Sequence, residues 1–279
     1  MWEGIMKQFK ALLIKEWHTH KFNFLIPSFV LGAFLVLATL ISIYGRIRYG
    51  GSVLTFGTEG EFNAVMVLRN LHYVLAAIVG WFGIATSLQL TDNLLNSDYQ
   101  KKCEIMHHSQ PVSLVKMLAA KFVFSVPMVL VQYLILTVIS SLILSAVSAY
   151  FGFNSWGIGL KAALSPFFLI FIATMVLSSL VSLFASVFRK QSTLKLLLTL
   201  ILIEALRLVL MRVWGAPEIF SPLSYYVKTF TMPFEAISFQ GAQASLVLEN
   251  AFNQKNLISL AVSVLMYMAG YFFYKRREL

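Results

Sequence analysis

Charged side chains that interrupt apolar stretches are the most chemically informative residues of this sequence. Glu204 and Arg207 stand three residues apart in a long apolar run, so on a helix they lie one turn apart on the same face. This spacing suits an ion pair, and an ionisable group inside a membrane span is a functional-site hypothesis by default. Two interpretations stay open: the pair fixes helix packing, or it lines a substrate path or a subunit interface.

A second carboxylate, Glu16, lies between Lys15 and Trp17 in an amphipathic N-terminal segment. Apolar residues recur in this segment at helical spacing, and Glu16 falls inside their arc. A carboxylate in such a place needs a partner, because burying an unpaired charge is costly. Either Glu16 extends to the lipid headgroups, or it contacts a partner subunit or a neighbouring span.

Patterns typical of metal sites and catalysis are missing from the sequence. His107 and His108 are neighbours, with Cys103 and Met106 close by, but adjacent side chains on a helix point about 100° apart and form no clean chelate. The chain also has no phosphate-binding P-loop and no His-Glu-x-x-His, Cys-x-x-Cys or Gly-x-Ser-x-Gly pattern. We therefore expect no metal, no cofactor and no enzymatic activity in this chain, so that another protein hydrolyses any ATP involved.

The elements that must position these residues are membrane helices. Hydrophobic residues make up 58% of the 279-residue chain and charged residues only 12%, which excludes a disordered or an ordinary soluble protein. The net charge is +10, but the basic residues are scattered among apolar segments rather than gathered on one soluble face. We therefore expect no nucleic-acid binding.

Six apolar segments approach or exceed the roughly 20 residues that cross a bilayer as a helix. Pro127 and Pro166 predict bends near the starts of the third and fourth. Lys and Arg number fourteen on one side of the six segments and seven on the other, so we expect both termini in the cytoplasm. The predicted spans lie at about 22–44, 72–91, 119–148, 160–188, 194–213 and 257–274.

The predicted fold is an all-α integral membrane protein. Residues 1–21 form an interfacial amphipathic helix, and residues 22–279 form a six-span transmembrane domain. Residues 96–113, between spans two and three, form a polar cytoplasmic segment with a short helix, and Ser113 can cap the helix that follows. The loop 214–256 lies on the extracytoplasmic side.

Two stretches carry a resemblance to a known family, the permease subunits of type-2 ABC transporters. Ala11–Lys21 is similar to the Lys/Arg-Glu-aromatic stretch that leads into the first span of these proteins. His108–Ser113, followed by Lys116 and Lys121, is similar to their small-x-Pro-Val-Ser segment with the basic residues that precede span three. Gln110 departs from the family pattern, which has an apolar residue before the proline.

The resemblance implies a transport function and its partners. It implies an exporter in the plasma (inner) membrane, formed with a second permease, identical or paralogous, and with a separate P-loop ATPase that binds ATP and Mg. The ATPase would dock on a coupling helix within residues 96–113, and the apolar spans suit a hydrophobic or amphipathic substrate and contact with membrane lipid. The expected coupling residues are Asp98, Tyr99, Lys101, Lys102, Glu104, Ile105, Met106, His107 and His108.

Two other functions stay open. The first is an ion-coupled secondary carrier that uses Glu204 and Arg207, with Glu204 as the titrating group. The second is a membrane scaffold subunit for another complex. Only the ABC interpretation requires a P-loop ATPase as a partner.

Overall fold

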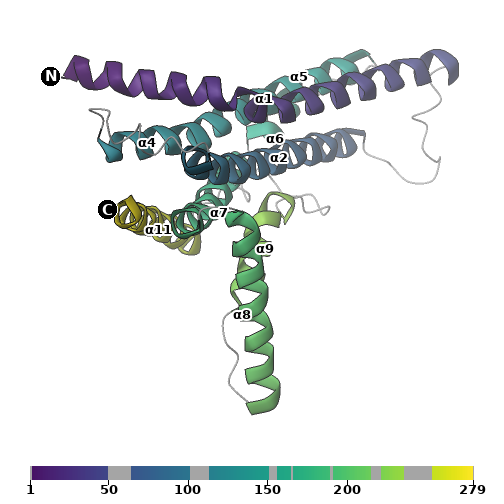
Figure 1. Ribbon diagram of the computed structural model, residues 1–279. Coiled ribbons are helices and arrows are strands. Elements are labelled where there is room, and N and C mark those ends of the chain that lie inside the picture. The colour runs from purple at the N-terminus through teal and green to yellow at the C-terminus, as the bar shows by residue number, and fades with distance from the viewer. Residues whose placement is uncertain are drawn as a thin grey trace.

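In the computed structural model of the chain, every element of the described part is an α-helix (Figure 1). The described residues are 2–49, 64–100, 113–150, 156–164, 166–188, 191–214, 221–235 and 253–278. The predicted all-α class is confirmed for these residues. The helices are α1 (Trp2–Tyr49), α2 (Ala64–Gln100), α4 (Leu114–Ser125), α5 (Pro127–Tyr150), α6 (Trp156–Leu164), α7 (Phe167–Val187), α8 (Ser192–Trp214), α9 (Pro222–Glu235) and α11 (Gln254–Glu278).

Five stretches of the described chain are long and apolar enough to cross a membrane, and they make the chain a multi-pass membrane protein. They include the cores of the first, second, third, fourth and sixth predicted spans. The third stretch includes both α4 and α5, whereas the others belong to single helices. The stretches are Met6–Ile41, Arg69–Asn96, Leu114–Tyr150, Phe167–Val187 and Gln254–Arg276.

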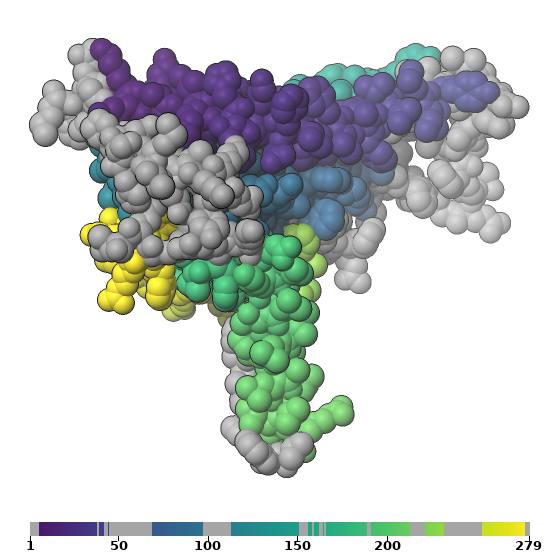
Figure 2. Space-filling model, viewed as in Figure 1, coloured from purple at the N-terminus to yellow at the C-terminus, as the bar shows by residue number. Residues whose placement is uncertain are grey.

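The fifth predicted span forms a helix, α8, but it is not one of these five stretches. Lys195, Glu204, Arg207 and Arg212 interrupt its apolar sequence within 23 residues. In Figure 1, α8 extends away from the other helices and crosses the direction of α1 steeply, and Figure 2 shows it as a protruding column. The count of six spans therefore stays a prediction.

The N-terminal segment and the first predicted span form one continuous helix. We expected an interfacial helix over 1–21 that is separate from the span, but α1 runs unbroken from Trp2 to Tyr49. No glycine or proline lies between Glu16 and Leu25, and Pro27 is accommodated inside the helix. An interfacial position for residues 1–21 stays a prediction.

Proline determines where the third and fourth predicted spans are interrupted. Pro127 begins α5, directly after Val126, whose N–H donates to the carbonyl of Phe122 at the end of α4. Pro166 precedes α7 and separates it from α6. Each proline where a bend was predicted therefore lies at a boundary between two helices, because proline has no N–H to continue the preceding helical turn.

The centre of the bundle is formed where α2 packs closely against α5 and α7. Gly83 lies against the Tyr133 ring, so an added Cβ would come within 2.9 Å of its Cγ atom. Ser87 on α2 donates to the carbonyl of Ser125 at 2.7 Å and lies 2.9 Å from the hydroxyl of Ser178 on α7. Small residues and interhelical hydroxyl bonds of this kind are typical of helices packed in membranes.

Candidate functional site

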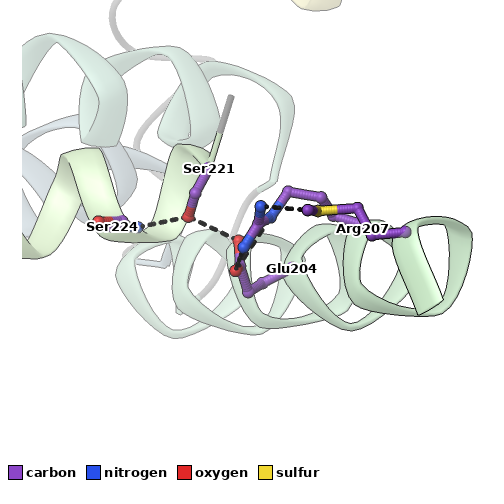
Figure 3. A network of polar contacts seen from close by, with 5 residues as sticks. Glu204, Arg207, Ser221 and Ser224 are labelled. Atoms are coloured by element: carbon purple, nitrogen blue, oxygen red, sulfur yellow. Dashed lines mark hydrogen bonds and ion pairs between the residues drawn. The ribbon is translucent and has the colours of Figure 1, made fainter. Parts of the chain in front are cut away.

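The predicted ion pair between Glu204 and Arg207 is present on α8 (Figure 3). The Arg207 guanidinium donates to Glu204 Oε1 from Nη2 at 2.6 Å and from Nε at 3.1 Å. Ser221 donates its hydroxyl to the other carboxylate oxygen, Oε2, at 2.7 Å. Both carboxylate oxygens therefore have a donor, and the side chains are 17% and 16% exposed.

Ser221 also explains what the pair does for the fold. It precedes Pro222, the first residue of α9, and its hydroxyl accepts the N–H of Ser224 at 3.0 Å. This is the geometry of an N-cap followed by proline at the first helical position. Glu204 therefore joins α8 to the start of α9 through the capping residue, an arrangement that supports the packing interpretation.

A second charge cluster is buried where α1, α2 and α4 meet, and we call it the Lys121 junction. Its members are Glu16, His20, Leu94 and Lys121. The Lys121 ammonium donates to the carbonyl of Leu94 and lies 3.8 Å from Glu16 Oε1. His20 Nε2 lies 3.9 Å from Glu16 Oε2. Both Glu16 and Lys121 are almost fully buried, at 3% and 2% exposed.

The junction decides between the alternatives for Glu16. The carboxylate contacts a neighbouring helix of the same chain instead of extending to the headgroups. Aromatic residues also connect these helices, since Trp17, next to Glu16, packs edge-on against Phe24 and Phe124 at centroid distances of 5.5 and 6.4 Å. In such surroundings a buried charge keeps its place only with an opposite charge and hydrogen bonds to satisfy it.

At this junction the first motif stretch contacts the helix that follows the second. Glu16 belongs to the first stretch, and Lys121 is a basic residue that follows the second. Lys116 makes another bond between the same helices, because its ammonium donates to Gln8 Oε1 at 2.9 Å. Lys15, the remaining predicted contact residue, is half-buried on α1, and its carbonyl accepts the Thr19 hydroxyl.

A third polar cluster joins α2 to the start of α8. Asp92 Oδ2 accepts the N–H of Thr193 at 3.2 Å and its hydroxyl at 3.0 Å. Asn96 donates to Asp92 Oδ1 at 2.7 Å and to the Ser192 hydroxyl at 2.9 Å. A carboxylate at a helix N-terminus is favoured by the unpaired N–H groups and by the helix dipole.

The Asp92 cluster was not predicted from the sequence. The signal that was present is an acidic residue four positions before an asparagine near the end of a predicted span, together with Ser192-Thr193 at a helix start. Gln191, directly before α8, has a left-handed backbone with φ of 54°. Because non-glycine residues rarely adopt that conformation, the turn into α8 carries local strain.

The predicted coupling residues lie mostly outside the described residues. Asp98 and Tyr99 belong to the last turn of α2, and their side chains are not described. At the far end of the segment, Ser113 takes the predicted N-cap position of α4, although its side chain makes no capping bond. Those outside the described part are Lys101, Lys102, Glu104, Ile105, Met106, His107 and His108.

The described part of the chain thus defines a multi-pass helical membrane protein with buried charge clusters at its helix junctions. Within that part, no group of three or more histidine, cysteine or acidic residues is placed to hold a metal ion. No family model, curated protein or solved structure matches the chain. A proposal about its function therefore depends on the motif stretches and on the geometry of the junctions.

Proposed function

We propose that this chain is the membrane-spanning permease subunit of an ATP-driven ABC exporter. It lies in the plasma (inner) membrane, with both termini in the cytoplasm. The observation that carries the proposal is the contact between Glu16 and Lys121. Glu16 belongs to the first stretch that resembles type-2 ABC permeases and Lys121 follows the second, and they are more than 100 positions apart in the sequence. Their burial beside each other supports a structural unit that joins the first stretch to the helix that follows the second.

The junctions provide a route for mechanical coupling. A partner ATPase that docks on residues 96–113 would push on the end of α2 and the start of α4. The bond from Lys121 to the Leu94 carbonyl joins these two helices, and Glu16 adds α1. Asp92 and Asn96 join the same end of α2 to the start of α8. A displacement of the coupling segment would thus reach both α1 and α8.

A second permease subunit fits the surface of α8. Large apolar side chains are exposed around much of this helix, among them Leu202 at 72% and Leu206 at 59%. Helix surfaces of this kind face either lipid or another membrane helix. In the proposed complex, a second permease, identical or paralogous, covers part of this surface, and a hydrophobic or amphipathic substrate passes between the two subunits.

The ion-coupled carrier is less well supported by the site. A titrating carboxylate of a carrier exchanges its proton or ion during transport, whereas Glu204 is bonded to Arg207 and Ser221 through both oxygens. The proteins that co-purify with the chain distinguish the scaffold alternative from the transporter, because only the ABC transporter requires a P-loop ATPase.

The test is affinity purification of the tagged full-length chain in mild detergent, followed by mass spectrometry. We expect a P-loop ATPase at near-stoichiometric amounts. The double variant Glu104→Ala/Met106→Ala is expected to reduce its recovery severalfold, whereas Lys228→Ala, an exposed residue of α9, is the matched control. Repeated absence of a P-loop ATPase from a folded, monodisperse sample would overturn the proposal.

A further inference from the structure

An apolar groove of about 800 Å³ lies between α2, α4, α7 and α11. Its walls include Leu95 of α2, Phe122 of α4 and Met175 of α7, and on α11 it follows Val264, Met268 and Tyr271. Large side chains at this groove are exposed: Val264 is 45% and Met268 is 56% accessible. A groove of this size, lined by apolar and aromatic side chains with few polar groups, is typical of a small-molecule site.

The direction of the groove is set by one stripe of α11. Val264, Met268 and Tyr271 recur at intervals of four and three residues, so they lie along one face of the helix. The next member of that stripe, four residues on, is Lys275, which is exposed, as is Arg276 beside it. Neither basic residue lines the groove, but Lys275 directly follows Tyr274, which does, so the cationic end of α11 is next in the sequence to the groove wall.

The length of the stripe matches one leaflet of a bilayer. From Val264 to Lys275 the helix rises roughly 16 Å at 1.5 Å per residue, close to half of the ~30 Å hydrocarbon thickness. An occupant that fits has an apolar chain of this length and a negative group at the end where α11 terminates. Lys121 does line the groove, but its ammonium is directed to the Leu94 carbonyl and Glu16.

We propose that this groove binds one anionic phospholipid from the leaflet on the side of the C-terminus. An acyl chain lies against Val264 and Met268, and the phosphate group contacts Lys275 and Arg276. Basic residues at the ends of membrane helices attract anionic headgroups in this way. The inference does not depend on the proposed transport function, because it concerns lipid binding to a groove within one chain and requires neither an ATPase nor a second permease.

The test is native mass spectrometry of the full-length chain in mild detergent, incubated separately with dioleoyl phosphatidylglycerol and with dioleoyl phosphatidylcholine at equal concentrations. We expect the first bound phosphatidylglycerol to be retained about tenfold more than phosphatidylcholine, because two cations contact its headgroup. The double variant Lys275→Gln/Arg276→Gln is expected to reduce this preference to about one, because it removes both headgroup charges.

A second variant tests the acyl chain. Met268→Trp fills the groove and is expected to reduce retention of phosphatidylglycerol at least severalfold, whereas Leu265→Trp on the neighbouring, 64% exposed position is the matched control. If Met268→Trp does not give a monodisperse sample, Val264→Trp replaces it. Equal retention of the two lipids would overturn the proposal, and so would unchanged binding of phosphatidylglycerol after the groove is filled. The proposal would also be overturned if the molecule displaced by the Met268 substitution were neutral.

Discussion

The Lys121 junction and the Glu204–Arg207 pair differ in where their partners come from. Glu204 and Arg207 are separated by one turn of the same helix and remain 17% and 16% exposed. Glu16 and Lys121 come from α1 and α4 and are 3% and 2% exposed. A local pair forms whenever its helix forms, whereas a buried pair between helices also depends on the fold that brings them together. The stability of the tertiary structure should therefore depend far more on the Lys121 junction.

The largest expected effect is the removal of the cation from that junction. Lys121→Met leaves Glu16 buried without its opposite charge, and removing one partner of a buried pair costs about 3–5 kcal/mol. Unfolding by SDS titration in mixed micelles measures the change. The double variant Glu16→Gln/Lys121→Met should recover most of the lost stability, because it leaves no uncompensated charge. A single variant as stable as the unaltered chain would contradict the comparison.

A smaller loss is expected at the contact between α2 and α8. Asp92→Ala removes the acceptor for the Thr193 N–H and hydroxyl, and loss of charge-assisted hydrogen bonds costs about 1–3 kcal/mol. Unfolding by SDS titration reports the loss, and Asn93→Ala on the same turn is the matched control. If α8 were held by apolar contacts alone, the two variants would be equally stable.

Substitution of the local pair should change stability less than either of these. In Glu204→Gln the amide keeps an acceptor oxygen for Arg207 or Ser221, and the partner on the next turn remains in place. The shift in the unfolding midpoint is expected to be less than about a third of that for Lys121→Met, because an incompletely buried pair contributes little. A shift as large as that of Lys121→Met would instead indicate that Glu204 is covered by another subunit or has a role beyond packing.

The smallest expected effect is a gain in stability rather than a loss. Gln191→Gly should stabilise the chain by about 0.5–1 kcal/mol, because glycine adopts the left-handed backbone at this position without steric cost. The same SDS titration measures the gain, with Gln191→Ala as the control that keeps a Cβ atom. A neutral Gln191→Gly variant would show that the turn before α8 is not strained in the membrane.

Local features of the structure were predicted well from the sequence. The apolar runs predicted the helices, Pro127 and Pro166 predicted their interruptions, and the spacing of Glu204 and Arg207 predicted their ion pair. Each of these depends on residues within one or two helical turns. The predicted break between an interfacial helix and the first span is absent from α1, because no glycine or proline near residue 21 stops helix propagation.

What the sequence alone determined is the membrane class, the helices and the charged residues that need partners. It showed that Glu16 lies on an apolar face, but it did not identify Lys121 as its partner or Thr193 as the partner of Asp92. Only the tertiary structure decided these contacts and the groove between α2, α4, α7 and α11. The physical reason is that helical periodicity defines the faces of each helix, whereas the pairing of faces depends on how all the helices pack together.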